Sequence, residues 1–423
     1  MDIADLLPLQ DTIAKCNRCG FCQAGCPVYR VTGEEHSVSR GRLAIARSLM
    51  LGELDLSPEV ARALEDCLLC RGCTAHCFPA LPTDEIVTAV RHAYLERHGQ
   101  PVWQRVLFRS VLADSKKLEW AGRWAVWAKR TGLAKAAGKV AGASSPLAAA
   151  EDVVPKLPER PFPRGERPAG ADPSVATARI GYFVSCGLSF QYPDVVEATL
   201  RVLGRAGCAV TILDNTCCGR PAHAYGDLDA ARDIARRNLD RLGPLPELEA
   251  VVSDCGSCST HLKDYGRLLA NDAAYRERAA AFSAKVRSFS EFLAARGLPK
   301  ATGRVDATVT YHDPCHLSNR FAKVTAQPRA LLKGVPGVTF QELPEADWCC
   351  GASGSYTFLH HTEATGVLDR KMDRVAKTKA DVLATECPAC MMHLSWGARR
   401  RGLPVAVRHV SQVLDEATGG ATS

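Results

Sequence analysis

The sequence predicts an α/β protein overall, with a mainly helical N-terminal domain followed by two tandem α/β domains. The first observation behind this prediction is that eight of the 19 cysteines lie within the first 80 residues, separated by short helical stretches. The second is a frame of five cysteines that occurs twice in the rest of the chain. The third is that apolar β-rich runs precede these cysteines and helix-like stretches follow them. Alternating strands and helices imply a small α/β layer per copy.

The composition is that of an ordinary globular protein. The chain has 423 residues, of which 23% are charged and 46% hydrophobic. The first residues, MDIADLLPLQ, contain acid instead of the basic start of a signal peptide, and no apolar run approaches the roughly 18 residues of a spanning helix. We therefore expect a cytoplasmic protein, in which cysteines serve as metal ligands and not as disulfides.

The net charge of +7 is concentrated in one segment. Residues 101–140 contain nine Lys and Arg residues against Asp114 and Glu119, and the rest of the chain is close to neutral. This distribution argues against a nucleic-acid partner.

The N-terminal cysteines follow the spacing of bacterial two-cluster ferredoxins. Each group has the form C-x-x-C-x-x-C-x-x-x-C, and the first ends in Cys26-Pro27. Three closely spaced thiolates wrap one face of a cubane, and the fourth ligates the other cluster. Two cubane [4Fe–4S] clusters are therefore predicted, one held by Cys16, Cys19, Cys22 and Cys77, the other by Cys67, Cys70, Cys73 and Cys26. A pair of zinc sites would leave the third cysteine of each group unexplained.

The two later frames match in register. The first comprises Cys186, Cys217, Cys218, Cys255 and Cys258, and the second comprises Cys315, Cys349, Cys350, Cys387 and Cys390. Corresponding cysteines are 129 to 132 residues apart, and 36 residues separate the double cysteine from the C-x-x-C in both copies. Five sulfurs exceed the four that zinc or a cubane uses, which favours a polynuclear centre; zinc in at least one copy is the alternative. Parallel strands would gather each set at their carboxyl ends.

These cysteine patterns resemble the iron–sulfur subunit of bacterial glycolate oxidase and its relatives. Those relatives include the iron–sulfur subunit of anaerobic glycerol-3-phosphate dehydrogenase, D-lactate dehydrogenase partner proteins and the CCG-containing subunit of heterodisulfide reductase. The strings DYGRLLANDAAY, WCCGASGSY and VRHVSQVLDEA resemble the glycolate oxidase subunit in particular. The resemblance implies that the double-cysteine (CCG) domains bind one or two non-cubane iron–sulfur clusters through the ten cysteines of the two frames. Some glycolate oxidase subunits lack one of these ten, so the complete set also supports the disulfide-reductase alternative.

Domain limits follow from composition and from the repeat. We predict a dicluster ferredoxin-like domain at 1–95, a basic Trp-rich helical segment at 96–140, a Pro-rich linker at 141–178, and CCG domains at 179–300 and 301–423.

Two further groups of residues are candidates for a role. Trp120, Trp124 and Trp127 fall at helical spacing among basic residues; they could dock on an acidic membrane surface or a partner, or could pack on the chain's own ferredoxin-like domain. Five histidines near the CCG cysteines suit hydrogen bonds to the centres or simple packing, and none is assigned as catalytic: His261, His312, His316, His393 and His409. Cys208 belongs to neither frame and is expected to be buried.

No phosphate-binding glycine loop, dinucleotide fingerprint or nucleophile–histidine–acid arrangement is evident. The expected function is therefore electron transfer. An FAD-containing partner would oxidise a 2-hydroxy acid such as glycolate or lactate, and the chain would relay electrons to a quinone, a membrane cytochrome or another acceptor, with peripheral attachment to the cytoplasmic face of the inner membrane as an option. The alternative is a heterodisulfide-reductase-type catalytic subunit that cleaves disulfides at its CCG centres.

Overall fold

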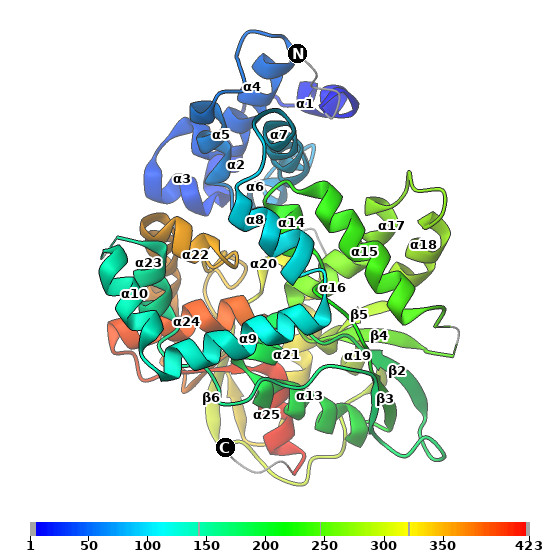
Figure 1. Cartoon of the computed structure of the whole chain (residues 1–423). Coiled ribbons are helices and arrows are strands. Elements are labelled where there is room, and N and C mark those ends of the chain that lie inside the picture. The colour runs from blue at the N-terminus through cyan, green and yellow to red at the C-terminus, as the bar shows by residue number, and fades with distance from the viewer. Residues whose placement is uncertain (1–5, 143, 246, 320–321, 420–423) are drawn as a thin grey trace.

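The computed structural model describes residues 6–142, 144–245, 247–319 and 322–419. A helical N-terminal unit lies against one end of a larger body that contains two β-sheets (Figure 1). The α-helices of the N-terminal unit are α1 (Gln10–Ala14), α2 (Cys22–Gly25), α3 (Pro27–Thr32), α4 (Ser39–Met50), α5 (Pro58–Glu65), α6 (Gly72–Ala75) and α7 (Thr83–His98), with 3-10 turns at Leu7–Leu9 and Glu35–Ser37.

The N-terminal unit forms around two amphipathic helices. Leu43 and Leu49 of α4 pack with Ile86 and Val90 of α7 in one buried cluster. The cysteine-bearing loops lie beside this core and turn sharply, with left-handed backbone at Arg18, Gly20, Leu69 and Arg71. The helical character predicted for this part of the chain is confirmed.

The first sheet has the strand order β1-β3-β2-β4-β5, and only the edge strand β1 is antiparallel. Its strands are β1 (Arg167–Gly170), β2 (Ala178–Tyr182), β3 (Cys208–Ile212), β4 (Ala250–Ser253) and β5 (Val286–Ser288). The second sheet is parallel throughout, with the order β7-β6-β8-β9. Its strands are β6 (Ala307–Tyr311), β7 (Val338–Phe340), β8 (Val382–Thr385) and β9 (Ala406–His409). The four parallel strands of each sheet follow the same order, which confirms the repeat as tandem α/β domains.

Helices cover both sheets, and the two repeats share buried clusters. Val195 of the first repeat and Val410, Val413 and Leu414 of the second lie in one cluster. The helices are α12 (Cys186–Gln191), α13 (Pro193–Arg205), α14 (Arg220–Ala224), α15 (Leu228–Leu242), α16 (Gly256–Lys263), α17 (Tyr265–Leu268), α18 (Arg276–Lys285), α19 (Phe289–Arg296), α20 (Cys315–Ser318), α21 (Ala326–Lys333), α22 (Tyr356–Leu359), α23 (His361–Thr378), α24 (Pro388–Arg401) and α25 (Val410–Ala417).

The segment between the N-terminal unit and the first sheet is more ordered than the sequence suggested. It contains α8 (Val102–Val106), a π-helical turn at Leu107–Val111, α9 (Ser115–Arg130), α10 (Leu133–Ala141) and α11 (Pro146–Val153). The interpretation of 141–178 as a linker was therefore wrong for α11 and β1, which both lie inside that range. Ser145 caps α11 with Pro146 at its first position, and the residues of β1 find hydrogen-bond partners in β3.

A carboxylate joins the two repeats. Asp415 of α25, 4% exposed, accepts hydrogen bonds from Arg201 and Arg205 of α13 at 2.6–3.1 Å. We expect Asp415→Asn to lower the free energy of unfolding by about 1–2 kcal/mol, less than for a fully buried pair because the side chain of Arg201 is 46% exposed. Urea denaturation followed by tryptophan fluorescence measures this. Asp306→Asn, in the exposed pair with Arg304, is the control and should change little. Equal stability of the two variants would contradict this role of Asp415.

Candidate metal centres

Each of the 19 cysteines is a free thiol. In the N-terminal unit, Cys26 at the start of α3 lies beside Cys67 and Cys70, and burial raises the pKa of its thiol to about 11. Burial raises the pKa of Cys73 as well, and so does its proximity to Cys26, Cys67 and Cys70. The structure thus brings together the four cysteines predicted to share one cluster, although two loops supply them. Their ligation stays a prediction.

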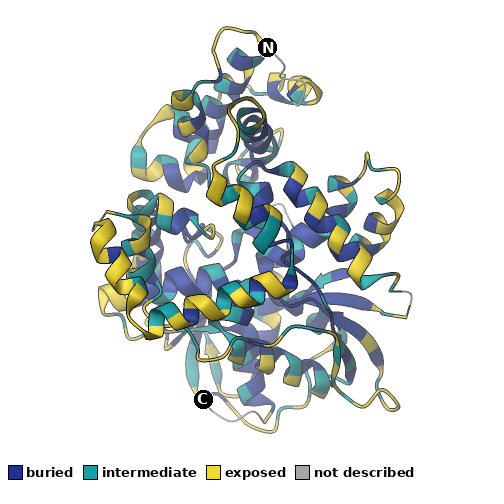
Figure 2. Cartoon of the chain, viewed as in Figure 1, coloured by how far each residue is buried: buried dark blue, intermediate teal, exposed yellow. Residues whose placement is uncertain are grey.

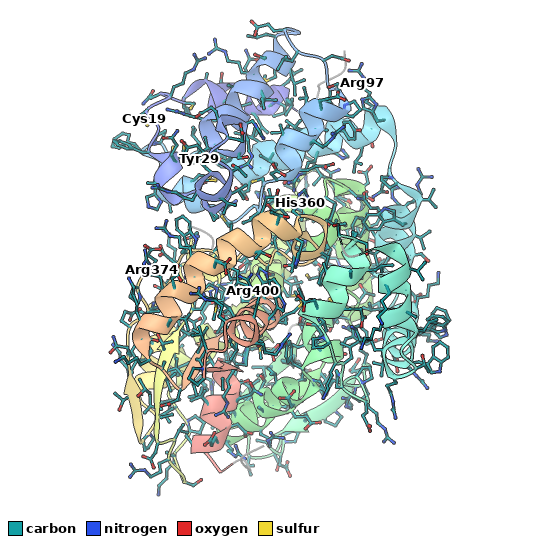
Figure 3. All side chains as sticks on the ribbon, turned by 90° about the vertical axis from the view of Figure 1, so that its left-hand side faces the viewer. Cys19, Tyr29, Arg97, His360, Arg374 and Arg400 are labelled. Atoms are coloured by element: carbon teal, nitrogen blue, oxygen red, sulfur yellow. The ribbon has the colours of Figure 1, made fainter. Side chains whose placement is uncertain are left out.

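The other predicted set is more open to solvent. Cys22 lies beside Cys16 and also beside Cys26 of the neighbouring set. Cys16 and Cys77 both pack against the core of α4 and α7. Cys19 is exposed, and Figure 3 shows it at the edge of the N-terminal unit. This set therefore lies at the surface, and Cys22 is next to the second set.

The buried guanidinium group of Arg42 indicates whether a negatively charged cluster fits between these cysteines. Arg42 of α4 is 2% exposed, and its Nε and Nη2 have no hydrogen-bond partner among the described residues. Its neighbours include Cys26, Cys67 and Cys73, whose charge acts to raise the pKa of Arg42. A cluster held by four thiolates is negatively charged, and such a group compensates a buried cation. The donor set and Arg42 together fit an iron–sulfur cluster.

The five cysteines of the first repeat form one connected group. Cys186 at the start of α12 hydrogen-bonds with Cys217, which raises the pKa of Cys186. Cys218 hydrogen-bonds with Cys217 and Cys258, and these contacts hold the pKa of Cys218 well below its usual range. Cys255 hydrogen-bonds with Cys258 in turn. The structure therefore assembles the predicted first set completely.

The second repeat repeats this connectivity. Cys315 at the start of α20 hydrogen-bonds with Cys349, which raises the pKa of Cys315. Contacts with Cys349 and Cys390 hold the pKa of Cys350 well below its usual range, and the Cys350 and Cys390 sulfurs are 3.4 Å apart. Cys387 hydrogen-bonds with Cys390.

The backbone explains why both repeats gather their sulfurs in this way. Cys255 and Cys387 lie two residues beyond β4 and β8 and occupy the N-cap positions of the helices that follow, α16 and α24. The glycines after the double cysteines, Gly219 and Gly351, adopt φ values of 91° and 87°, which favour glycine. Each glycine N–H points back to a sulfur: Gly219 to Cys217 and Gly351 to Cys349, both at 3.5 Å. Parallel strands thus deliver the cysteines to the carboxyl ends of both sheets.

The structure also joins the predicted sites to each other. Cys255 and Cys387 interact across the two repeats, and this interaction lowers the pKa of Cys387. Cys70 and Cys349 interact between the N-terminal unit and the second repeat, and this interaction raises the pKa of Cys70. The thiols therefore form one continuous line, here called the cysteine line. It runs from the surface set through the set of Cys26, then through the second repeat to the first.

Two further cations, one buried and one half-buried, lie beside the cysteine line, and sequence reasoning missed both of them, as it missed Arg42. Lys371 of α23 is 0% exposed, donates to the carbonyl oxygens of Glu345 and Ala346, and has Cys350 as a neighbour; burial lowers its pKa to about 8. Arg164, from the range interpreted as a linker, has Cys186 as a neighbour, and burial lowers its pKa. Single basic residues give no signal in the sequence, because nothing local marks them as buried.

The five candidate histidines have different environments. His393 Nδ1 lies 2.9 Å from the Cys350 carbonyl oxygen, and His409 Nε2 lies 2.9 Å from the Asp254 carbonyl oxygen. His316 Nδ1 lies 2.8 Å from Ser257 Oγ, which lies 3.7 Å from Cys387 Sγ. His261 packs edge-on against the rings of His223 and Tyr265. His312 alone among these five contributes a ring nitrogen to a group with the Cys350 and Cys390 sulfurs in which all three atoms lie within 4.8 Å of one another.

Cys208, as expected, is buried in β3.

Family comparison agrees with this arrangement. Residues 12–79 match the family described as "4Fe-4S dicluster domain", and residues 180–263 and 309–395 each match "Cysteine-rich domain" (CCG). The fold and its sites thus define an iron–sulfur protein with one dicluster domain and two CCG domains.

Comparison with individual proteins shows to which family of iron–sulfur proteins the chain belongs. The chain is 30% identical to the "Probable glycolate oxidase iron-sulfur subunit" of Bacillus subtilis, over 97% of this chain and 95% of that protein. It therefore belongs to the family of glycolate oxidase iron–sulfur subunits. Lactate utilization protein A of an Exiguobacterium species is 30% identical over 56% of this chain and 97% of that protein. A subunit of the fumarate reductase (CoM/CoB) of Methanothermobacter marburgensis is 34% identical over 57% of this chain and 46% of that protein.

The cluster assignment can be tested at Cys22. We expect Cys22→Ser to remove about four of about sixteen irons and to abolish one low-potential EPR signal, because this thiol would hold a single [4Fe–4S] cluster. Iron analysis and EPR of anaerobically purified protein measure both quantities. Cys208→Ser, a buried cysteine outside every set, should keep the full iron content. Unchanged spectra for Cys22→Ser would refute the assignment, and about eight irons with two zincs in the wild type would indicate zinc in the CCG domains.

Proposed function

We propose that the chain is the electron-transfer subunit of a flavin-dependent 2-hydroxy-acid dehydrogenase or oxidase complex, acting on glycolate or lactate. The cysteine line is the observation that carries this proposal, because it leads from an exposed end, at Cys19, through the protein interior. Iron–sulfur clusters bound along it would supply one-electron transfer. The names of the glycolate and lactate relatives support the substrate class. Two cubane clusters in the dicluster domain and two non-cubane clusters in the CCG domains would use all eighteen cysteines of the four sets.

The exposed end of the cysteine line is suited to a flavoprotein partner. Phe21 and Phe78, each next to a cysteine of the surface set, are 65% and 93% exposed. Large apolar side chains exposed beside a redox site mark a contact surface for another protein. Electrons from an FAD-containing subunit would then enter the chain at the set that includes Cys19.

The other end of the line lies beneath the Trp-rich helix α9. Gly122 of α9 packs so closely on Phe190 of α12 that a Cβ there would meet the ring at 2.1 Å. Helix α12 begins at Cys186, the last cysteine of the line. Electrons would therefore leave toward a quinone or another acceptor near α9.

Helix α9 presents its tryptophans to solvent. Trp120, Trp124 and Trp127 are 66%, 49% and 51% exposed, and the Trp124 ring contacts the other two. Figure 2 shows exposed positions along α9. The alternative that these rings pack on the chain's own ferredoxin-like domain is therefore wrong. Leu118 and Val126 are the apolar side chains that α9 buries. None of the helices within the described residues is long and apolar enough to cross a membrane. An exposed aromatic stripe among basic residues instead suits docking on an acidic surface, which we assign to the cytoplasmic face of the inner membrane.

The relay can be tested on the native complex. We expect addition of glycolate or lactate to the co-purified anaerobic complex to bleach the visible absorption of the clusters, because electrons pass from the flavin into this chain. Absorption and EPR spectra before and after addition measure the reduction. The isolated chain, which shows no flavin-binding signature in its sequence, should not respond. A complex that neither substrate reduces would argue against this substrate class.

The docking helix can be tested with vesicles. We expect Trp120→Ser, Trp124→Ser and Trp127→Ser together to weaken binding to phosphatidylglycerol-containing vesicles by about tenfold or more, since the three rings provide the exposed apolar face. Co-sedimentation at low and high salt measures the binding, which should also weaken with salt. Phe78→Ser, at the other end of the cysteine line, should bind like wild type. Equal binding by the triple variant would assign α9 to a protein partner instead.

The second candidate function is disulfide cleavage at the CCG centres. Similarity to the CoM/CoB fumarate reductase and the complete set of ten cysteines favour it. Purified protein with an artificial electron donor should reduce the heterodisulfide CoM-S-S-CoB under this alternative. Under the relay function it should not.

A further inference from the structure

His312 stands out among the residues near the cysteine line. It directly follows β6 and is 0% exposed. Neither of its ring nitrogens has a hydrogen-bond partner among the described residues. One of them lies in a group with the Cys350 and Cys390 sulfurs in which each pair of atoms is within 4.8 Å.

A buried imidazole without partners is costly unless something else satisfies it. Leaving a buried donor or acceptor unpaired costs about 1–3 kcal/mol. Two other histidines near the cysteine line each have a ring nitrogen paired with a backbone carbonyl oxygen, although His393 Nε2 has no partner among the described residues: these are His393 and His409. A neutral imidazole has one nitrogen lone pair, and histidine is a common metal ligand together with cysteine. The unpartnered ring therefore indicates that a metal ion or cluster binds between His312, Cys350 and Cys390.

The first repeat provides an internal comparison. His312 lies three residues before Cys315, and the matching residue before Cys186 is Phe183. Phe183 also directly follows its strand, β2, and is 0% exposed. The two repeats thus share fold, strand order and cysteine frame, and they differ at this buried position by an imidazole against a phenyl ring. A phenyl ring is sufficient to fill this buried position in the first repeat. Packing therefore does not explain why the second repeat has an imidazole there.

We propose that His312 is a nitrogen ligand of the iron–sulfur centre in the second repeat, at the iron that Cys350 and Cys390 hold. This inference rests on the proposed function in assuming iron–sulfur centres in the CCG domains. The second repeat then has a mixed His/Cys donor set, while the first has cysteine only. His312 would add a neutral nitrogen donor to a complete set of five thiolates, so the two CCG centres would differ in donor set and therefore in reduction potential.

The decisive measurement is made on wild-type protein. In protein labelled with ¹⁵N-histidine, pulsed EPR of the second-repeat centre in its paramagnetic state should show a directly coordinated ¹⁵N nucleus. Absence of this coupling overturns the proposal without any variant. X-ray absorption that finds zinc with nitrogen and sulfur neighbours in the second repeat also overturns it.

Variants then assign the nitrogen to His312. We expect His312→Phe, which copies the residue of the first repeat, to abolish the coupling and shift the midpoint potential of this centre. His98→Phe, outside the second repeat at a ring whose Nε2 lies on the Leu56 carbonyl oxygen, should keep both. Phe183→His should add a second coupled nitrogen, which provides a test even where His312→Phe fails to hold its iron. Coupling that persists in His312→Phe would assign the nitrogen to another residue and refute the proposal. If the proposed relay function were wrong, glycolate or lactate would not reduce the clusters of the dicluster domain in the complex. That measurement does not depend on His312, so the two failures can be told apart.

Discussion

The contact between the two repeats is the constraint on which the rest of the structure depends. The N–H of Gly256 donates to the Glu386 carbonyl oxygen at 2.8 Å, and a Cβ at Gly256 would meet Leu317 at 2.9 Å. This close approach of backbone to backbone, beside Cys255 and Cys387, brings the two carboxyl ends of the sheets together. Without it the CCG cysteines would form two separate sites, and the cysteine line would be interrupted in the middle.

Buried positive charge is the second organising feature. Arg42 and Lys371 are buried and Arg164 is half-buried. The three come from different parts of the chain, and each lies beside a different set of cysteines. Such cations are costly to bury unless negative charge accompanies them. Iron–sulfur clusters bound to thiolates would supply that charge, and the cations would in turn raise the reduction potentials along the cysteine line. The same residues thus connect the stability of the fold to its proposed electron transfer.

The two ends of the cysteine line differ in a way that suits a relay. One end is exposed at Cys19, and the other lies next to α12, on which α9 packs with its exposed tryptophans. The π-helical turn before α9 and the packing of Phe108 and Leu112 in the core of the first repeat fix this helix on the body. A donor and an acceptor could therefore contact opposite ends of the chain without competing for one surface.

Local spacing in the sequence determined the cysteine sets, the strands before them and the tandem repeat, because ligand loops and strand–helix units are built from neighbouring residues. Tertiary structure alone decided the contact of Cys70 with Cys349, the burial of Arg42 and Lys371, and the position of His312 against Cys350. These features join residues that are far apart in the chain, and no periodicity records such contacts. The range 141–178 likewise could not be predicted from its own proline-rich sequence. Strand β1 and the position of Arg164 depend on hydrogen bonds to partners in the first repeat.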